Sequence, residues 1–365
     1  MKRRDILLGA AAVAAGGAGA VLLGLRQMGS MDEYDAAVAA SRSALSQAPE
    51  ARDFVRFATL AANSHNTQAW RFSLAGGGIE IRPDLSKRLA AVDPDDHHLY
   101  ASIGCAAENL AIAAAARGKS GELNFDPAQD GVVRFAYGDG TSGPSDLFEA
   151  ITTRQSTRGD YDGRTVSGGD LQKLRVAADA IRGVDLALIT DRPQIDRVRD
   201  LVIAGNSAQL ADPAFMHELK AWLRFNPWQA MLTGDGLFSA TSGNPVLPAW
   251  LGPLAIDAFF TAGAENDKYA RQIASSAGIA IFAAEKDDPE HWVLAGRACQ
   301  RFALQATALG IKHAFINQPV EVPTLRPELA RVAGLPGRRP DILMRFGYGP
   351  ALPYSLRRPV EAVLS

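Results

Sequence analysis

The stretch Asn63-Ser64-His65-Asn66-Thr67-Gln68-Ala69-Trp70 is the most informative one for the fold of this chain. It is a run of uncharged amide and hydroxyl groups, which both donate and accept hydrogen bonds, and it ends in an aromatic residue. Such groups suit a planar heterocycle whose edge alternates donors and acceptors. Residues 54–60 before the run show helical apolar spacing, and residues 70–74 after it alternate as in a half-buried strand. An Asn-capped helix end followed by a polar turn explains the run equally well, so the rest of the chain must decide.

The bulk composition permits one large core or two ordinary ones. The chain has 365 residues, 47% of them hydrophobic, and a formal net charge of -2, which gives no electrostatic footprint for nucleic acid. Cys105 and Cys299 lie in apolar helical stretches and are expected to be small buried hydrophobic residues. His97 and His98 follow two aspartates, but adjacent residues on a helix point apart and further ligands are not evident, so we predict no metal site.

Residues 1–30 have the composition of a targeting segment. Arg3 and Arg4 precede a stretch from Ile6 to Leu25 that carries no charge and is rich in Ala and Gly. This pattern is typical of a twin-arginine export signal, and an N-terminal membrane anchor is the alternative. We therefore expect the chain to engage the twin-arginine export machinery and to be periplasmic, or membrane-anchored and facing outward. Whether the signal is cleaved stays open.

Two stretches share one layout, which predicts an internal duplication. One Ala-rich helix runs from Gly104 to Gly118 and another from Gly296 to Gly310, with equal glycine spacing. Each follows an acidic loop, and small residues on one face let two helices approach closely. We predict an α+β fold of two fused similar halves, each a sheet flanked by helices. Chance similarity of two Ala-rich helices is the alternative.

The halves are expected at 31–143 and 144–365, joined by a Gly-rich turn. Gly138, Gly140 and Gly143 in this turn also match a dinucleotide fingerprint, which would indicate a pyridine-nucleotide dehydrogenase. A linker is favoured, because no second strand ending in an acidic residue follows at the usual distance. Residues 205–268 show no clear period, and we interpret them as an insertion that forms a candidate lid.

A cationic half-site is indicated by the segment Arg154-Gln155-Ser156-Thr157-Arg158. Alternate residues of an extended segment point the same way, so Arg154, Ser156 and Arg158 can converge. Two guanidinium groups and a hydroxyl suit a phosphate or an electron-rich carbonyl. Arg357 and Arg358 form a second cationic pair near the end of the chain. Exposed surface arginines are the alternative for both.

These motifs resemble those of nitroreductase-fold flavoproteins. Residues 62–70 are similar to the family's Pro-Ser-Ser-x-Asn-x-Gln-Pro-Trp segment, and residues 154–158 to its Arg-x-Ser-x-Arg start. Residues 64–68, 317–322 and 357–360 resemble the Acg-type branch, in which one chain mimics the usual dimer and keeps one flavin site. Ala69 stands where the family has proline, so this loop is expected to be less rigid. The internal dimer-like interface would favour a monomer.

The resemblance implies a bound FMN held by both halves. Arg154 and Ser156 would hold the ribityl phosphate region, Arg158 would lie near the pyrimidine edge, and Arg357 and Arg358 would neutralise the phosphate. Asn63, Ser64, Asn66 and Gln68 would reach from the first half toward the ring and its chain. Asn317 and Gln318 would present backbone N–H groups to the flavin N5 and O4 edge.

By the same resemblance, we expect an oxidoreductase that transfers two electrons through flavin N5 to a small organic acceptor of nitroaromatic or quinone type. No residue of the chain is assigned a catalytic role of its own. The alternative is a non-catalytic protein that binds or stores FMN beneath the lid, because a lid can block nicotinamide from stacking. An exported protein would also meet little NAD(P)H and would need another electron donor, or none.

Overall fold

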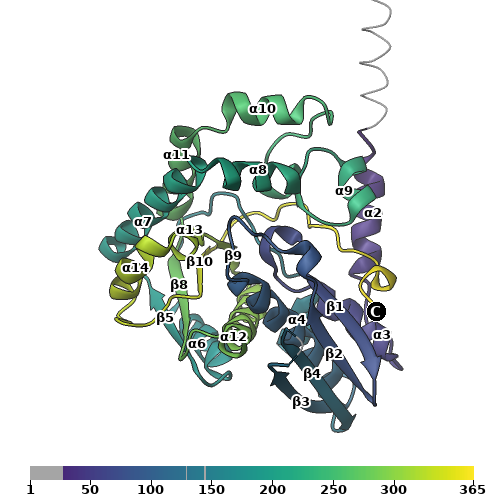
Figure 1. Ribbon diagram of the computed structural model, residues 1–365. Helices are drawn as coiled ribbons and strands as arrows, with labels where there is room; N and C mark the ends of the chain where they lie inside the picture. The colour runs from purple at the N-terminus through teal and green to yellow at the C-terminus, as the bar shows by residue number, and fades with distance from the viewer. Residues whose placement is uncertain (1–27, 129, 144) are drawn as a thin grey trace, which may run out of the picture.

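The computed structural model describes residues 28–128, 130–143 and 145–365 (Figure 1). The export-signal prediction for residues 1–30 falls almost entirely on residues 1–27, outside the described residues. Within the described ranges, no helix is long and apolar enough to cross a membrane.

The first half contains one four-stranded sheet with helices packed on it. Its strands follow the order β1-β2-β4-β3, and every neighbouring pair is antiparallel. The elements are α2 (Met31–Ser41), α3 (Ala51–Thr59), η1 (Ser64–Asn66), β1 (Trp70–Ala75), β2 (Gly78–Pro83), η2 (Leu85–Lys87), α4 (His97–Ala115), β3 (Lys119–Asp126) and β4 (Val132–Asp139).

The second half repeats this topology. Its sheet has the order β5-β8-β10-β9, again with antiparallel neighbours throughout, so β5, β8, β9 and β10 correspond to β1, β2, β3 and β4. The elements that build the half are α5 (Asp146–Ile151), α6 (Gly168–Asp179), β5 (Val184–Ile189), β8 (Gly278–Ala284), α12 (Pro289–Ala308), β9 (Lys312–Phe315), α13 (Gln318–Glu321), η4 (Pro323–Leu325), α14 (Arg326–Val332), β10 (Ile342–Gly347) and η5 (Val360–Ala362). The α+β class is confirmed.

The central helices α4 and α12 join the halves, and they lie between the two sheets in Figure 1. A Cβ on Gly104 would overlap the carbonyl oxygen of Val293, and one on Gly296 would overlap that of Ala101. This close approach also brings Cys105 of α4 beside Cys299 of α12, both as buried free thiols, and Sγ of Cys105 donates to the Gly296 carbonyl at 3.1 Å.

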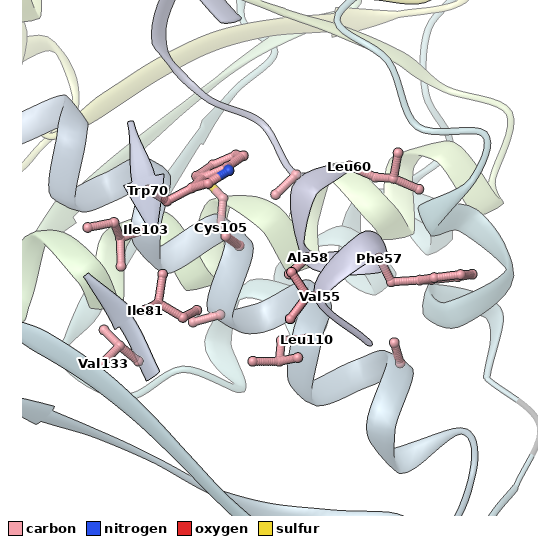
Figure 2. Packing of buried hydrophobic residues seen from close by; sticks show 14 of the residues in the cluster. Val55, Phe57, Ala58, Leu60, Trp70, Ile81, Ile103, Cys105, Leu110 and Val133 are labelled. Atoms are coloured by element: carbon pink, nitrogen blue, oxygen red, sulfur yellow. The ribbon is translucent and has the colours of Figure 1, made fainter. Parts of the chain in front are cut away.

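The core of the first half follows from the apolar face of α3. Phe54, Val55, Phe57 and Ala58 are buried, as their helical spacing predicts, and they pack against α4 and the sheet. Figure 2 shows Trp70 beside Cys105, with Ile103 nearby. Removing such side chains from water contributes about 1.5–3 kcal/mol for each large residue.

The insertion occupies the site of a hairpin turn. In the first half, Gly76 and Gly77 alone separate β1 from β2, whereas residues 190–277 separate the corresponding β5 and β8. The insertion is longer than the predicted 205–268, and both predicted ends fall inside helices. It contains α7 (Arg192–Leu210), α8 (Pro213–Trp222), β6 (Leu223–Arg224), α9 (Pro227–Thr233), β7 (Leu237–Phe238), η3 (Ser239–Ser242), α10 (Gly252–Phe259) and α11 (Ala262–Ala274).

Capping residues explain why this stretch is helical without a clear apolar period. Asp191, Asp212 and Asn226 each accept a backbone N–H at the start of a helix, and a proline lies in the first turn of each of these helices. In Figure 1, α8 and α10 arch over the end of the molecule opposite β3.

The Gly-rich turn does not form a nucleotide-binding loop. Gly138 lies inside β4, which pairs antiparallel with β2 and β3, so the parallel strand–helix–strand unit of the dinucleotide fingerprint is absent at this point. The hypothesis of a pyridine-nucleotide dehydrogenase built on this turn is therefore not supported.

Two extended segments pair with edge strands of the two sheets, and the first of them connects the halves. The C-terminal tail returns to the first half, where Leu364 forms a parallel bridge with Phe72 of β1. Ser156 forms a parallel bridge with His313 of β9. These connections bring both cationic motifs to the interface between the halves.

Candidate functional site

A cavity of about 510 Å³ lies between the two halves and beneath the insertion. The first half contributes Asn63, Ser64, His65 and His98, and the second half contributes Arg158, Asn317, Gln318 and Arg345. The insertion contributes apolar side chains, among them Phe215, Phe225, Ile256 and Phe260. Its size and its apolar walls with a few convergent polar groups are those of a small-molecule or cofactor site.

A second, smaller cavity of about 30 Å³ is lined by four arginines: Arg42, Arg154, Arg158 and Arg357. None of the described residues that line it is a carboxylate, and Ser156 and Asn66 add a hydroxyl and an amide. Asn63 and Arg158 line both cavities, so the two adjoin. A concentration of uncompensated guanidinium groups is a strong anion site.

Burial and mutual repulsion act on these arginines. Burial, together with the charge of Arg154, lowers the pKa of Arg42 to about 9. Burial and the charges of Arg42 and Arg154 lower the pKa of Arg357 well below its ordinary value. Bringing an anion into the small cavity would relieve both the desolvation and the repulsion.

Some guanidinium groups of the small cavity already donate hydrogen bonds to the protein, and others have donors without a partner among the described residues. Arg357 donates to the carbonyl of Thr59 at 2.7 Å and to Oδ1 of Asn66 at 2.6 Å. Arg154 donates from Nη2 to the Leu60 carbonyl at 3.0 Å, but its buried Nε and Nη1 have no partner in the described part of the chain. Arg158 has no side-chain partner among the described residues. The buried Nε of Arg42 also lacks a partner among the described residues, so Arg42, Arg154 and Arg158 hold donors that are free for a ligand.

The amide run is a strained loop rather than a simple helix end. His65, Asn66 and Gln68 have φ angles of 47°, 55° and 53°, in the left-handed region that non-glycine residues rarely adopt. Backbone held in such a conformation is concentrated at functional sites. Asn63 and Ser64 line the large cavity, and Asn66 lines the small one.

Gln68 and Arg358 line neither cavity. Gln68 is fully buried, donates to the carbonyl of Gly234 at 2.8 Å and accepts the backbone N–H of Arg358 at 2.9 Å. The Arg358 guanidinium donates back to the Gln68 carbonyl. These two side chains tie the loop to the insertion and to the C-terminal tail, so their predicted direct roles toward flavin are not favoured by their positions.

The start of α13 forms another wall of the large cavity. Asn317 accepts the Leu343 N–H at 2.8 Å, which fixes this turn on β10. The Oε1 atom of buried Gln318 has no partner. In the described part of the chain, the backbone N–H groups of Asn317 and Gln318 also have no acceptor, as expected at a helix start.

The sequence reasoning missed Arg42, His65, His98 and Arg345. Within the described ranges, the Nδ1 atom of His65, Nε2 of His98 and Nε of Arg345 are buried without a hydrogen-bond partner. Burial, with the charge of Arg158 second, lowers the pKa of His65 to about 4, so the imidazole is neutral near pH 7. The positive φ of His65 is visible only in the structure, and Arg42 ends an ordinary helix, so neither carried a sequence signal.

His97 and His98 do not point apart as we expected. Their rings lie 4.6 Å apart, and ligand atoms of Asp93, His97 and His98 all lie within 4.8 Å of one another. Asp93 accepts the N–H groups of His98 and Leu99, at 2.9 and 3.0 Å, and His97 bonds Asp341 at 2.8 Å. These bonds fix the start of α4.

Comparison with known proteins finds relatives that are named as nitroreductases. No protein-family model matches the chain. It is 28% identical over 342 residues to "Putative NAD(P)H nitroreductase Rv3131" of Mycobacterium tuberculosis strain H37Rv, covering 89% of this chain and 94% of that protein. The same values hold for "Putative NAD(P)H nitroreductase MT3217" of strain CDC 1551.

Solved structures with partial similarity carry the same name. A nitroreductase with bound FMN from Desulfitobacterium hafniense aligns with a TM-score of 0.37 at 15% identity, over 59% of this chain and 94% of that one. The FMN-dependent nitroreductase NfnB of Mycobacterium smegmatis, in complex with NADPH, aligns with a TM-score of 0.38 at 11% identity, over 56% of this chain and 87% of that one. The chain is thus similar to proteins named as nitroreductases.

Proposed function

We propose that this protein is an FMN-dependent oxidoreductase of nitroreductase type, with one flavin site built from both halves of a single chain. The observation that carries this proposal is the small cavity beside the larger one, which four arginines and no carboxylate line among the described residues. The relatives named as NAD(P)H nitroreductases and the FMN-bound neighbours support the choice of cofactor.

The residues present fit FMN. A phosphate in the small cavity would take hydrogen bonds from the free donors of Arg154 and Arg158, and from Ser156. An isoalloxazine ring in the large cavity would find the unpaired Gln318 amide oxygen and the open N–H groups of α13 on one side. Asn63 and Ser64 would contact it from the first half.

When bound, the flavin supplies two-electron transfer through N5. The chain's own residues bind and orient it: the arginines hold the phosphate, and the amide groups fix the position of the ring. The apolar residues of the insertion, of which Phe225 and Phe238 are buried, would reduce the access of water to the cavity. The acceptor we propose is a small nitroaromatic or quinone.

A protein that binds or stores FMN without turnover is the second candidate. It is favoured by the insertion itself, because α8, α10 and the loop between α9 and α10 contribute side chains to the wall of the large cavity. A lid in this position would block a nicotinamide from stacking on the flavin.

The visible spectrum of the purified protein, before and after anaerobic addition of NADPH or NADH, separates these functions. An oxidoreductase that accepts these donors is yellow and is bleached by one of them. A yellow protein that neither donor bleaches, but that dithionite reduces, would favour the storage role or a different donor. A colourless protein that cannot be loaded with FMN would refute both.

We further propose export by the twin-arginine route, based on Arg3, Arg4 and the uncharged stretch that follows. This route carries folded proteins, which fits a cofactor loaded before export. Replacing both arginines by lysine should retain the protein in the cytoplasm of a host with this pathway. Unchanged export of that variant would contradict the proposal.

A further inference from the structure

The insertion carries an apolar surface whose partner the flavin site does not explain. Eight large hydrophobic side chains are exposed among the described residues, and five of them belong to the insertion. These five define the insertion surface, and their exposed fractions range from 42% to 77%: Trp228, Leu232, Trp250, Leu254 and Phe259. Such a concentration of exposed apolar side chains in one part of a chain is typical of a protein or membrane contact.

We propose that the insertion surface rests on a lipid bilayer. Two tryptophans, a phenylalanine and two leucines have the composition of a membrane-interface contact, because aromatic side chains prefer the headgroup level. The surface is formed by α9, by α10 and by the loop that precedes α10, which lie at one end of the molecule in Figure 1.

The contacts of the first described residues, Met28 and Gly29, support a lipid bilayer as the partner. The carbonyl of Met28 accepts the backbone N–H of Trp228 at 3.0 Å, and a Cβ on Gly29 would press against the Trp228 backbone. The uncharged stretch that ends at Leu25 is only three residues away, at most about 11 Å along an extended chain. If this stretch enters a bilayer, α9 must lie at the bilayer surface.

The insertion surface is also continuous with the large cavity. Phe259 is the most exposed of the five residues and lines the cavity as well, together with Ile256 of the same helix. An apolar molecule dissolved in the bilayer would therefore meet the wall of the cavity at the contact. The membrane contact itself is independent of the proposed redox chemistry.

Brominated lipids provide a direct test. The full chain, including residues 1–27, is bound to vesicles of phosphatidylcholine and phosphatidylglycerol, with and without bromine near the top of the acyl chains. Of the five tryptophans, Trp70 and Trp292 are buried, so quenching by bromine reports mainly on the insertion. We expect bromine to quench the protein's fluorescence, and we expect W228F/W250F to lose most of this quenching.

Two results would overturn the proposal. One is a vesicle-bound protein whose tryptophan fluorescence bromine does not quench, which would mean that residues 1–27 alone hold it. The other is quenching that persists in W228F/W250F.

A second pair of variants keeps the proposal testable if tryptophan replacement disturbs folding. L254S/F259S should reduce vesicle binding at least several-fold, whereas L74S/V176S, which alters exposed residues on β1 and α6, should leave it unchanged. Equal binding of both variants would contradict the proposal. So would a change from oligomer to monomer in L254S/F259S without vesicles, because the surface would then join copies of the chain.

Discussion

Gly104 and Gly296 make the same contact in opposite directions. Gly104 lies against the carbonyl of Val293, three residues before Gly296, and Gly296 lies against that of Ala101, three residues before Gly104. The two sheets also have the same strand order, so the two halves are equivalent in topology as well. A single chain thus contains an interface of the self-complementary kind found in two-fold dimers.

Gly104→Ala should destabilise the protein by about 2–3 kcal/mol, because the new methyl group meets a backbone oxygen that cannot rotate away. Urea unfolding measures the effect. Gly263→Ala is the matched control: this glycine lies in α11 with open space around its Cα, so alanine there should be neutral or stabilising by up to about 1 kcal/mol. Equal effects of the two substitutions would refute the close helix contact.

Removal of one arginine from the small cavity should weaken FMN binding. Arg42→Gln or Arg154→Gln should raise the Kd for FMN about 10- to 100-fold, since each loses charge-assisted contact with the phosphate. Arg358→Gln serves as the control, because Arg358 bonds Gln68 outside both cavities and its loss should leave the Kd nearly unchanged. Flavin fluorescence titration gives all three values. A larger loss from Arg358→Gln than from Arg154→Gln would reverse the assignment.

Asp341 should make the stability of the protein pH-dependent. Burial raises its pKa to about 7, so the folded state holds a proton that the unfolded state releases near pH 4. This contribution to stability is fully present below about pH 4 and is lost as the pH rises through about 7. Asn mimics the protonated carboxyl, so the stability of Asp341→Asn relative to wild type should rise by a few kcal/mol between pH 4 and 8.

Urea unfolding of both proteins at several pH values measures this difference. His97, which bonds Asp341 at 2.8 Å, has its pKa lowered to about 3 chiefly by burial, so it stays neutral over this range. A difference that stays constant or falls with rising pH would mean that Asp341 is ionised in the folded protein.

The sequence motifs predicted the parts of the site that are local in the chain. Asn63, Ser64, Arg154, Ser156 and Arg158 line the cavities, because strand and loop spacing determines which side chains share a direction. The equal glycine spacing correctly indicated that two equivalent helices pack together.

The remaining features depend on contacts between distant segments. Arg42 joins the cluster only because α2 ends beside residues 152–154, to which its guanidinium donates hydrogen bonds. Gln68 belongs to the same motif as Asn66, but its side chain bonds Gly234 and Arg358 and lines neither cavity. The bounds of the insertion emerged only when the second sheet could be matched strand by strand with the first.

In the site we propose, four arginines from both halves of the chain hold the phosphate of one FMN. Parallel titrations of the full, cofactor-depleted protein with FMN and with riboflavin, which lacks the phosphate, test it most directly. We expect one FMN bound per chain and a riboflavin Kd at least about 100-fold higher, corresponding to two or more charge-assisted contacts. Equal affinities for FMN and riboflavin, or no binding of FMN, would contradict it.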